Sequence, residues 1–340
     1  MPANLTPEYR AAEAAFRGSR DPEERLERLR EMLRVIPKHK GTDHLQADIK
    51  RRIKELGAEL EAPRKGGARG APALIVRPEG AAQIALLGPP NSGKSSLHAR
   101  LTASGAHAAA YPFTTQHPRA GMMPHEDISF QLVDLPAISP EHPVPWLAGA
   151  LQSADACLLV VDLGDPACLE QIEAVHAVLA GQRVRLTSRW NAPGEAVPPQ
   201  GENGDPFALR LAALLLANKA ECVSDPQAEL RAFLELEGFD YPALAVSAVT
   251  GQGLGELGPW LFSHLEIVRV YTKTSGKAAD GGRPFALRAG QTVEDVARLV
   301  HQDLARSLKY ARVWGKAGFH GQHVGREHVL ADGDLIELHS

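Results

Sequence analysis

The stretch Gly88-Pro89-Pro90-Asn91-Ser92-Gly93-Lys94-Ser95 fits the pattern GxxxxGK[ST]. It lies directly after an apolar run, Ile84–Leu87, and directly before a segment with helical character. In such a context the glycines let backbone N–H groups point inward at phosphate oxygens, and the start of the helix adds the positive end of its dipole. We expect Lys94 to reach the β- and γ-phosphates of a nucleotide and Ser95 to ligate Mg²⁺. The stretch therefore predicts a phosphate-binding loop between a strand and a helix.

Apolar runs alternate with helical patterns on both sides of this loop, from residue 82 to about residue 265. The expected strands are Ile84–Leu87, Phe130–Val133, Cys157–Val161, Leu214–Ala217 and Leu244–Val246. The expected helices cover residues 93–103, 168–180, 226–237 and 254–264. This alternation predicts an α/β domain with a mostly parallel sheet and helices on both faces. Turn-forming residues at 187–207 indicate a loop insertion before the strand expected at Leu214–Ala217.

Helical patterns precede this central domain. Thr6-Pro7 and Asp21-Pro22 each place a capping side chain before a proline suited to the first helical position. Apolar residues then recur at steps of three and four on either side of the break at Lys40-Gly41-Thr42. This spacing predicts two long amphipathic helices packed as an antiparallel hairpin. Pro, Gly and Arg in the stretch 62–80 indicate a linker into the next domain.

After Leu265 the pattern changes to short strands, with one helix expected around Val293–Arg306. The strands are expected at 267–272, 285–288, 311–315 and 335–338, which predicts a small α+β domain. The chain is therefore divided into a helical region (1–70), a linker (71–81), the central domain (82–265) and a C-terminal domain (266–340).

The composition excludes several classes of protein. The 340 residues are 44% hydrophobic and 23% charged, which is typical of a folded globular protein. The longest strictly apolar stretch, Leu211–Ala217, is far shorter than the roughly 18 residues of a membrane-spanning helix, and residues 1–20 lack the apolar core of a targeting signal. We expect a cytoplasmic protein without a membrane partner. Three cysteines without CxxC spacing argue against a disulfide framework and a zinc site.

The charge is unevenly distributed along the chain. The formal net charge of −4 combines 16 Lys/Arg and 12 Asp/Glu in residues 1–70 with an acidic remainder. A basic end on an acidic body is compatible with an RNA partner for that end, although solvated helix faces often carry such charges.

A site that hydrolyses a nucleotide needs groups beyond the phosphate loop. Asp134, at the end of the strand expected at Ile128–Val133, is the candidate carboxylate that holds Mg²⁺ through water. Thr114 and Thr115 offer a polar group that senses the γ-phosphate, and Thr115 is favoured. Taken alone, either threonine is better explained as an ordinary loop residue than as a ligand.

The choice of base depends on Asn218-Lys219-Ala220-Glu221, which follows the strand expected at Leu214–Ala217, at the edge where α/β sheets place ligands. The Glu221 carboxylate can accept hydrogen bonds from guanine N1–H and the 2-amino group, which adenine does not offer, while the stem of Lys219 covers the base. Ser247-Ala248-Val249 follows another strand and can present backbone N–H groups to the guanine oxygen. The order and spacing of these segments indicate a guanine nucleotide.

Together, the segments GPPNSGKS, YPFTT, DLPA, NKAE and SA resemble the Obg-related GTPases, in particular their developmentally regulated GTP-binding branch. The tail, with RVYTK, TVEDVA, GQHVG and HVLADGDLIELH, is similar to the TGS domain that ends those proteins, a ubiquitin-like β-grasp module. The resemblance covers nearly the whole chain from about residue 38.

The resemblance implies GTP/GDP and Mg²⁺ as cofactors, phosphate binding by Gly88 to Ser96, and a switch role for Thr115 and Asp134. It also implies association with a ribosome or another RNA–protein complex. RNA contact is expected through the basic N-terminal helices or the TGS domain, and no DNA partner is expected.

Four positions depart from the usual pattern or add to it. Ala137 stands where the family has the glycine of DxxG, so we expect damped switching, and Ile138 stands where many GTPases have a water-orienting glutamine, so we expect slow hydrolysis. Glu221 replaces the usual Asp, as it does in the Obg-like ATPases that prefer ATP. Asn91 either only shapes the loop or coordinates K⁺, as asparagine does at this position in related GTPases.

The sequence therefore favours slow, Mg²⁺-dependent GTP hydrolysis that controls affinity for an RNA–protein partner. Two rivals stay open: a nucleotide-bound scaffold with negligible turnover, and an ATP-preferring enzyme.

The tail carries a further pattern. Basic and aromatic residues interleave at Lys309, Tyr310, Arg312, Trp314 and Lys316, as in sheets that stack and clamp single-stranded RNA. Tyr310, Arg312 and Trp314 share one strand face, however, and packing into the core is the more usual outcome for such aromatics. The nearby histidines, His320, His323 and His328, are expected to be surface or packing residues and not metal ligands.

Overall fold

The computed structural model describes residues 6–19, 22–37, 42–61, 76–102, 117–190, 208–237, 240–273, 283–315 and 321–340. The chain forms two compact units, one containing the N-terminal helices and one containing the central and C-terminal domains. Within the described ranges, no helix combines the length and the apolar character that crossing a membrane requires.

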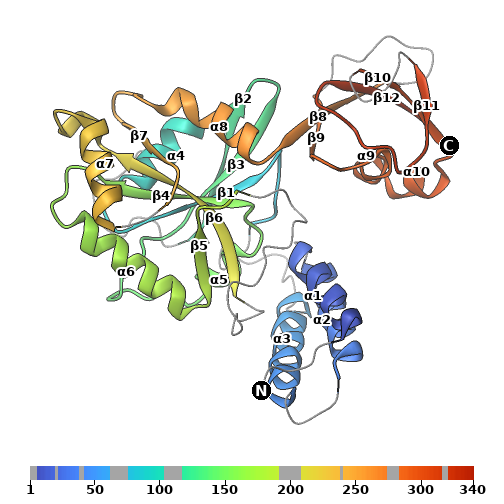
Figure 1. Cartoon of the computed structure of the whole chain (residues 1–340), viewed down its shortest axis with the longest axis horizontal. Helices are drawn as coiled ribbons and strands as arrows, with labels where there is room; N and C mark the ends of the chain where they lie inside the picture. Colours follow the sequence, from blue (N-terminus) through green and yellow to red (C-terminus); the bar gives the residue numbers. More distant parts are fainter. Residues whose placement is uncertain are drawn as a thin grey trace, which may run out of the picture. The chain divides into compact units, whose positions relative to one another are not determined.

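The N-terminal unit contains the helices α1 (Pro7–Gly18), α2 (Pro22–Val35) and α3 (Asp43–Glu61) (Figure 1). α1 begins at the expected cap, where Thr6 Oγ1 accepts a hydrogen bond from the Tyr9 N–H at 3.2 Å. α2 and α3 pack as the predicted pair, but α1 also packs against α2. Its Tyr9 is fully buried in one cluster with Met32 and Ile49. The prediction of a hairpin is therefore corrected to a three-helix unit, because α1 supplies part of the core.

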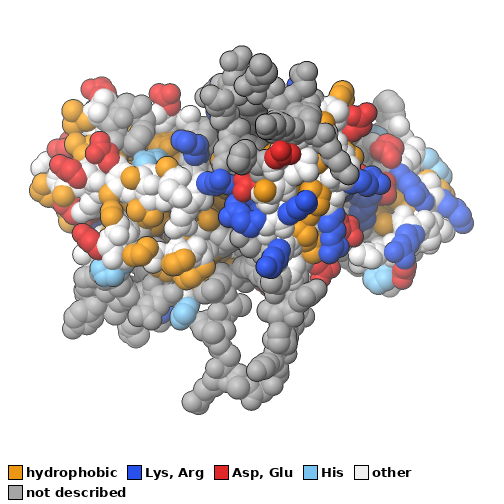
Figure 2. All heavy atoms as spheres, turned by 90° about the horizontal axis from the view of Figure 1, so that it is seen from below, with side chains coloured by type: hydrophobic (Ala, Val, Ile, Leu, Met, Phe, Trp, Pro, Cys, Tyr) orange, Lys and Arg blue, Asp and Glu red, His pale blue; other side chains and the backbone are white. Residues whose placement is uncertain are grey.

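The described surface of this unit carries both cationic and acidic side chains. Exposed cationic side chains occur on all three helices: Arg10, Arg30, Arg34, Lys50, Arg51 and Lys54. Figure 2, which draws the whole chain, shows blue Lys and Arg side chains gathered in the middle and at the right of the face that it presents, with red Asp and Glu side chains among them. Some have acidic neighbours one turn away, such as Arg34 with Glu31 at 3.2 Å and Arg51 with Asp48 at 2.8 Å. Exposed pairs of this kind stabilise a helix only slightly, but they lower the positive charge that a polyanion would meet.

The central sheet contains β1 (Gln83–Leu87), β2 (Arg119–His125), β3 (Ile128–Asp134), β4 (Ala156–Asp162), β5 (Val184–Thr187), β6 (Leu209–Asn218) and β7 (Ala243–Ala245). The strand order is β2-β3-β1-β4-β6-β5, and β7 also pairs with β6. The pairs β1–β3, β1–β4, β4–β6 and β6–β7 are parallel, whereas β2 runs antiparallel to β3. The five predicted strands are confirmed, and β2 and β5 are additional. The parallel strands bring their carboxyl ends to one edge, where ligands bind in such sheets.

The helices of this domain are α4 (Lys94–Thr102), α5 (Leu147–Leu151), α6 (Cys168–Gly181), α7 (Pro226–Glu237) and α8 (Leu257–His264). Figure 1 shows α4 and α8 on one side of the sheet and α6 on the other. Leu97 of α4 and Leu261 of α8 are buried in the same cluster as Leu86 and Leu132 of the sheet. Burial of this apolar surface holds α4, and with it the phosphate loop, against the strands. The predicted sheet with helices on both faces is thereby confirmed.

The C-terminal domain has a second sheet, in the order β11-β10-β12-β8-β9. Its elements are β8 (Ile267–Thr272), β9 (Phe285–Arg288), α9 (Val293–Val300), α10 (Gln302–Ser307), β10 (Tyr310–Trp314), β11 (Gln322–Val324) and β12 (Asp334–His339). The single helix predicted for 293–306 is wrong, because His301 has extended dihedrals (φ −168°, ψ 140°) and separates α9 from α10. Its side chain instead accepts a hydrogen bond from the Asp303 N–H at 3.2 Å and caps the second helix.

The expectation that the aromatic residues of β10 enter the core is also wrong. Ala311 and Val313 are the fully buried residues of that strand, whereas Tyr310, Arg312 and Trp314 are partly exposed. Side chains alternate between the two faces of a strand, so the aromatic residues occupy the sheet face opposite to the buried cluster.

Polar contacts connect the central and C-terminal domains within their common unit. Arg288 pairs with Asp155 at 2.8 Å, and both side chains are almost buried. Arg269 pairs with Asp332 at 2.9 Å and also with Asp127 in the turn between β2 and β3, and the Tyr271 hydroxyl donates to the same Asp127. Burial lowers the pKa of Arg288 to about 10. The nearly buried ion pair of Arg288 and Asp155 therefore connects the C-terminal domain to the central domain.

Candidate functional site

Two glycines of the phosphate loop have no room for a side chain. Gly88 has φ +150°, and a Cβ placed on it would lie 2.2 Å from the carbonyl oxygen of Val160. Gly93 has φ +88°, and its Cβ would lie 2.2 Å from Nδ2 of Asn218. Both residues therefore need to be glycine, because the loop turns tightly and lies against two neighbouring strands.

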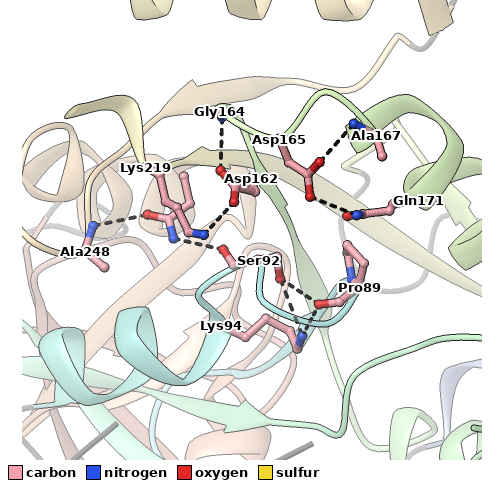
Figure 3. A network of polar contacts seen from close by, with 11 residues as sticks. Pro89, Ser92, Lys94, Asp162, Gly164, Asp165, Ala167, Gln171, Lys219 and Ala248 are labelled. Carbon is pink, nitrogen blue, oxygen red and sulfur yellow. Dashed lines mark hydrogen bonds and ion pairs between the residues drawn. The ribbon is translucent and has the colours of Figure 1, made fainter. Parts of the chain in front are cut away.

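Lys94 lies inside the loop with only 6% of its surface exposed. Its Nζ donates to the carbonyl oxygens of Gly88 at 3.1 Å and Pro89 at 2.8 Å, as Figure 3 shows for Pro89. Burial lowers the pKa of Lys94 to about 8, although the negative charge of Asp134 acts in the opposite direction. An ammonium group so poorly solvated favours a phosphate oxygen as a partner.

Ser95 and Asp134 come from different elements and meet beside this lysine. The Ser95 hydroxyl at the start of α4 donates to Asp134 Oδ2 at the end of β3, at 2.6 Å. Asp134 is 1% exposed. A hydroxyl and a carboxylate oxygen are ligands that Mg²⁺ accepts, so these residues fit the metal role that the sequence predicts. Thr114 and Thr115 lie outside the described residues.

The segment after Asp134 is packed against the phosphate loop. Leu135, Pro136, Ala137, Ile138 and Ser139 are all buried. The Ile138 N–H donates to the Gly88 carbonyl at 3.0 Å. Ala137 does not belong to the described non-glycine residues with positive φ, so alanine is accommodated there without backbone strain. The Ile138 side chain, which is 2% exposed, offers no polar group to a water molecule.

Asn218 connects the phosphate loop to the loop after β7. Its Nδ2 donates to the Ser92 carbonyl at 2.9 Å, and its Oδ1 accepts from the Ala248 N–H at 3.1 Å. Figure 3 shows this link from Ser92 to Ala248. Because Asn218 is 1% exposed, both bonds are shielded from water and fix the relative positions of the two loops.

Lys219 pairs with a residue that the sequence did not single out. It has a left-handed backbone (φ 61°, ψ 34°), and its Nζ lies 2.5 Å from Oδ2 of Asp162. Asp162 ends β4 and is in register with Asn218 of β6. Its other carboxylate oxygen accepts from the Gly164 N–H at 3.0 Å (Figure 3). The signal that could have revealed it is an acidic residue directly after the apolar run Cys157–Val161, at the ligand edge of the sheet.

The other candidates for base recognition differ in how far they are exposed. Glu221 is exposed in a short 3-10 helix, Ala220–Cys222, three residues after Asn218. Ser247 is fully buried and accepts from the Thr250 N–H at 2.9 Å, while Val249 is 72% exposed. The N–H groups of Ser247 and Ala248 donate within the protein, to Gln252 and Asn218. Base recognition by Glu221 and by the Val249 N–H stays a prediction.

Comparisons with known proteins agree with this geometry. Two family models match the chain: a TGS domain at residues 268–340 and a 50S ribosome-binding GTPase at residues 83–188. An uncharacterised GTP-binding protein of Methanocaldococcus jannaschii is 27% identical in an alignment of 367 positions that covers 93% of this chain and 92% of that protein. Developmentally regulated G-protein 2 of Arabidopsis thaliana is 27% identical in an alignment of 360 positions that covers 93% of this chain and 90% of that protein. The chain is therefore homologous over most of its length to proteins named developmentally regulated GTP-binding proteins, and it contains the GTPase and TGS domains that the two models describe.

The central domain is accordingly a P-loop GTPase domain, and the C-terminal domain is a TGS domain. The match to the GTPase family model implies guanine-nucleotide binding, typically with Mg²⁺, and in general GTP hydrolysis. A crystal structure of a GTP-binding protein from Pyrococcus horikoshii OT3 covers 76% of this chain and 99% of its own, with a TM-score of 0.48 and 16% identity.

Proposed function

We propose that this protein is a cytoplasmic GTP-binding protein that hydrolyses GTP slowly with Mg²⁺ and acts as a ribosome- or RNA-associated regulator of translation. The observation that carries the nucleotide part is the double hydrogen bond of Asn218, which joins the phosphate loop at Ser92 to the base-side loop at Ala248. The buried Lys94 and the Ser95–Asp134 pair lie on the phosphate side of the same assembly.

The residues divide the work of the reaction as follows. Lys94 and the backbone N–H groups of the phosphate loop bind the β- and γ-phosphates. Mg²⁺ held by Ser95 and Asp134 would neutralise charge on phosphate oxygens. A water oxygen then bonds to the γ-phosphorus and gives up a proton to a phosphate oxygen. The bond from that phosphorus to the β–γ bridging oxygen breaks, the electron pair stays on the bridging oxygen, and GDP and phosphate are released. Ile138 cannot orient the water, and this supports slow turnover.

The decisive experiment is a titration of the purified protein with fluorescent GDP in Mg²⁺, competed separately by GTP, GDP, ATP and ADP. The proposal expects displacement by guanine nucleotides only. Displacement by adenine nucleotides at similar concentrations would favour the ATP-preferring alternative and would contradict a guanine-specific role for Glu221. Absence of binding would overturn the nucleotide proposal as a whole.

A scaffold with negligible turnover is the second candidate. It is favoured by the burial of the segment Leu135 to Ser139 and by the bond from the Ile138 N–H to Gly88, which hold that segment in place. Single-turnover hydrolysis of GTP separates the candidates. A rate above that of a Lys94→Ala variant supports the slow GTPase, and a rate equal to it supports the scaffold.

An experiment can distinguish between the two roles considered for Asn91. Its φ of 61° fits a loop-shaping residue, and its exposed side chain fits a ligand for K⁺. An Asn91→Gly variant keeps access to the left-handed conformation but removes the amide. Faster hydrolysis in KCl than in NaCl, lost in this variant, would establish the K⁺ role. Equal rates in both salts would exclude it.

The association with ribosomes is supported by the match of residues 83–188 to a 50S ribosome-binding GTPase model and by the exposed cations on α1, α2 and α3. Co-sedimentation with ribosomes should depend on whether GDP or a non-hydrolysable GTP analogue is bound. Absence of co-sedimentation in every nucleotide state would overturn this part of the proposal.

A further inference from the structure

Two polar side chains of α4 contact β3 behind the phosphate loop. Ser95, in the first turn of α4, donates to Asp134 Oδ2 at 2.6 Å. One turn further along the helix, Nε2 of His98 lies 3.3 Å from the carbonyl oxygen of Leu132. Residues three apart share a face of a helix, and residues two apart share a face of a strand. The His98 contact therefore lies directly behind the pair of candidate Mg²⁺ ligands, between the same helix and the same strand.

The environment of His98 favours a neutral ring that donates to this carbonyl. The side chain is 5% exposed. Burial lowers the pKa of His98 below its usual value, although the negative charge of Asp134 and the contact with Leu132 act in the opposite direction. A carbonyl oxygen only accepts hydrogen bonds, so the single proton of a neutral ring lies on Nε2. Because water is largely excluded, this hydrogen bond holds α4 to β3 more firmly than an exposed one would.

The far end of α4 lies against the neighbouring strand β2. Gly121 of β2 is in register with Leu132 of β3. A Cβ placed on Gly121 would lie 2.7 Å from Cγ2 of Thr102, the last residue of α4. The Thr102 hydroxyl donates to the carbonyl oxygen of His98 at 2.7 Å, and this bond stays within α4. His98 thus contributes the bond between helix and sheet, whereas Thr102 contributes van der Waals contact.

The groups expected to bind phosphate and those expected to bind Mg²⁺ are distributed differently over these elements. The phosphate loop and Lys94 lead directly into α4, so a displacement of α4 moves them together. The two candidate Mg²⁺ ligands are divided between the elements, with Ser95 on α4 and Asp134 on β3. A displacement of α4 relative to β3 therefore changes the separation of these ligands. Mg²⁺ is sensitive to such a change because it requires nearly ideal octahedral geometry.

We propose that His98 is a positioning residue for the Mg²⁺ of the nucleotide site. Its bond to Leu132 fixes α4 relative to β3, and the separation of the Ser95 and Asp134 side chains is thereby kept at the value that the metal requires. His98 acts through the two elements that it joins, in the way that outer-shell partners orient metal ligands. This inference rests on the proposed function and deepens it, because it assigns part of the Mg²⁺ dependence of nucleotide binding to one side chain outside the phosphate loop.

The test measures the affinity of the full-length protein for fluorescent GDP twice, at saturating Mg²⁺ and in EDTA. The ratio of the two affinities gives the coupling between metal and nucleotide. His98→Leu removes the donor and keeps a buried side chain. It should lower this ratio by about fivefold, which corresponds to one neutral hydrogen bond. Its affinity for GDP in EDTA should equal that of the unchanged protein, because the phosphate-binding groups move together with α4.

Two further variants separate positioning from a general loss of stability. His98→Gln should restore the ratio, because its amide nitrogen can donate from about the position of Nε2. Thr102→Val is the matched control: it removes one hydrogen bond from the same helix and keeps the methyl group next to Gly121. It should leave the ratio unchanged. If thermal unfolding shows that His98→Leu does not fold, His98→Asn replaces it, because its shorter amide is polar but does not reach the Leu132 carbonyl.

Four results would overturn the proposal. The first is an unchanged ratio in His98→Leu. The second is a loss of GDP affinity that is the same in EDTA as in Mg²⁺, which would indicate a general effect on the nucleotide site. The third is a ratio in His98→Gln as low as in His98→Leu, and the fourth is an equal fall in Thr102→Val.

Failure of this inference can be distinguished from failure of the proposed function. If the unchanged protein does not bind GDP, the nucleotide proposal is wrong. If it binds GDP equally well in Mg²⁺ and in EDTA, the metal role of Ser95 and Asp134 is wrong, and the role of His98 is overturned with it. If Mg²⁺ strengthens GDP binding equally in the unchanged protein and in His98→Leu, only the role of His98 is wrong.

Discussion

Replacing Asn218 by alanine should weaken nucleotide binding without touching either a phosphate-loop residue or a switch residue. The variant removes two buried hydrogen bonds, from Nδ2 to the Ser92 carbonyl at 2.9 Å and from the Ala248 N–H to Oδ1 at 3.1 Å. At about 1 kcal/mol net for each bond, the lost stabilisation is about 2 kcal/mol. If the loops must be brought back into place when a nucleotide binds, this corresponds to a roughly thirtyfold loss of affinity for GDP.

The chain offers a matched control in Gln182. Its side-chain amide also makes two bonds, accepting from the Ala148 N–H at 3.2 Å and donating to the Val144 carbonyl at 3.0 Å. Gln182→Ala thus removes the same kinds of bond from the same domain, but from residues that are not part of the nucleotide site. It should lower the unfolding temperature without changing the affinity for GDP.

The assay is a GDP titration by calorimetry on both variants, alongside thermal unfolding without nucleotide. Asn218→Ala should lower the unfolding temperature by about 4–8 °C, at about 2–4 °C for each kcal/mol in a domain of this size. The reasoning would be refuted if Asn218→Ala bound GDP as the unchanged protein does, or if Gln182→Ala weakened GDP binding to the same degree.

Three further changes have defined outcomes. Asp162→Asn removes the negative charge that pairs with Lys219. Because about a third of the Lys219 side chain is exposed, the affinity for GDP should fall by no more than about fivefold, and by less in high salt. A loss above a hundredfold would contradict the small contribution expected of a partly exposed ion pair. The pKa of Lys94 is lowered to about 8, so above pH 8 the nucleotide-free protein loses the proton with which Lys94 binds phosphate oxygens. The affinity for GDP should therefore not change with the ionisation of Lys94 below pH 8 and should fall as the pH rises above 8. Calorimetry in buffers of different ionisation enthalpy would detect the proton taken up on GDP binding, and absence of this uptake at pH 9 would contradict the assignment. Ala137→Gly should lower the free energy of unfolding by about 0.4–1 kcal/mol, because alanine is unstrained there and glycine gains freedom in the unfolded chain; urea unfolding measures this, and a stabilised variant would contradict it.

The sequence predicted the nucleotide-binding core well because its signals are local. The phosphate loop occupies eight consecutive residues, and the apolar runs of β4 and β6 are typical of buried strands of a parallel sheet. Asn218 and Asp134 follow such runs directly, so their place at the ligand edge follows from the strand direction. β2 and β5 were missed because β2 contains Pro124 and exposed positions and β5 has only four residues.

Other features depend on contacts that sequence spacing does not reveal. The pair of Lys219 and Asp162 joins residues 57 positions apart. The break at His301 interrupts a stretch whose apolar spacing suits one helix, because a histidine cap competes with helix continuation. Tyr310 and Val313 lie on opposite faces of β10, and the alternation is the same whichever face is covered. Only the position of α9 decides which of them is buried.

The carbonyl oxygen of Gly88 couples the lysine of the phosphate loop to the segment that follows Asp134. It accepts hydrogen bonds from Lys94 Nζ at 3.1 Å and from the Ile138 N–H at 3.0 Å. When Lys94 turns to a phosphate oxygen, this carbonyl loses its charged donor and keeps the amide of Ile138, and the remaining bond strengthens because it is no longer shared. Nucleotide binding should thus strengthen the bond from the Ile138 N–H to Gly88 and keep residues 135–139 packed against the phosphate loop. The damping of the switch that we expect from Ala137 then has its cause in this bond as well as in the missing glycine.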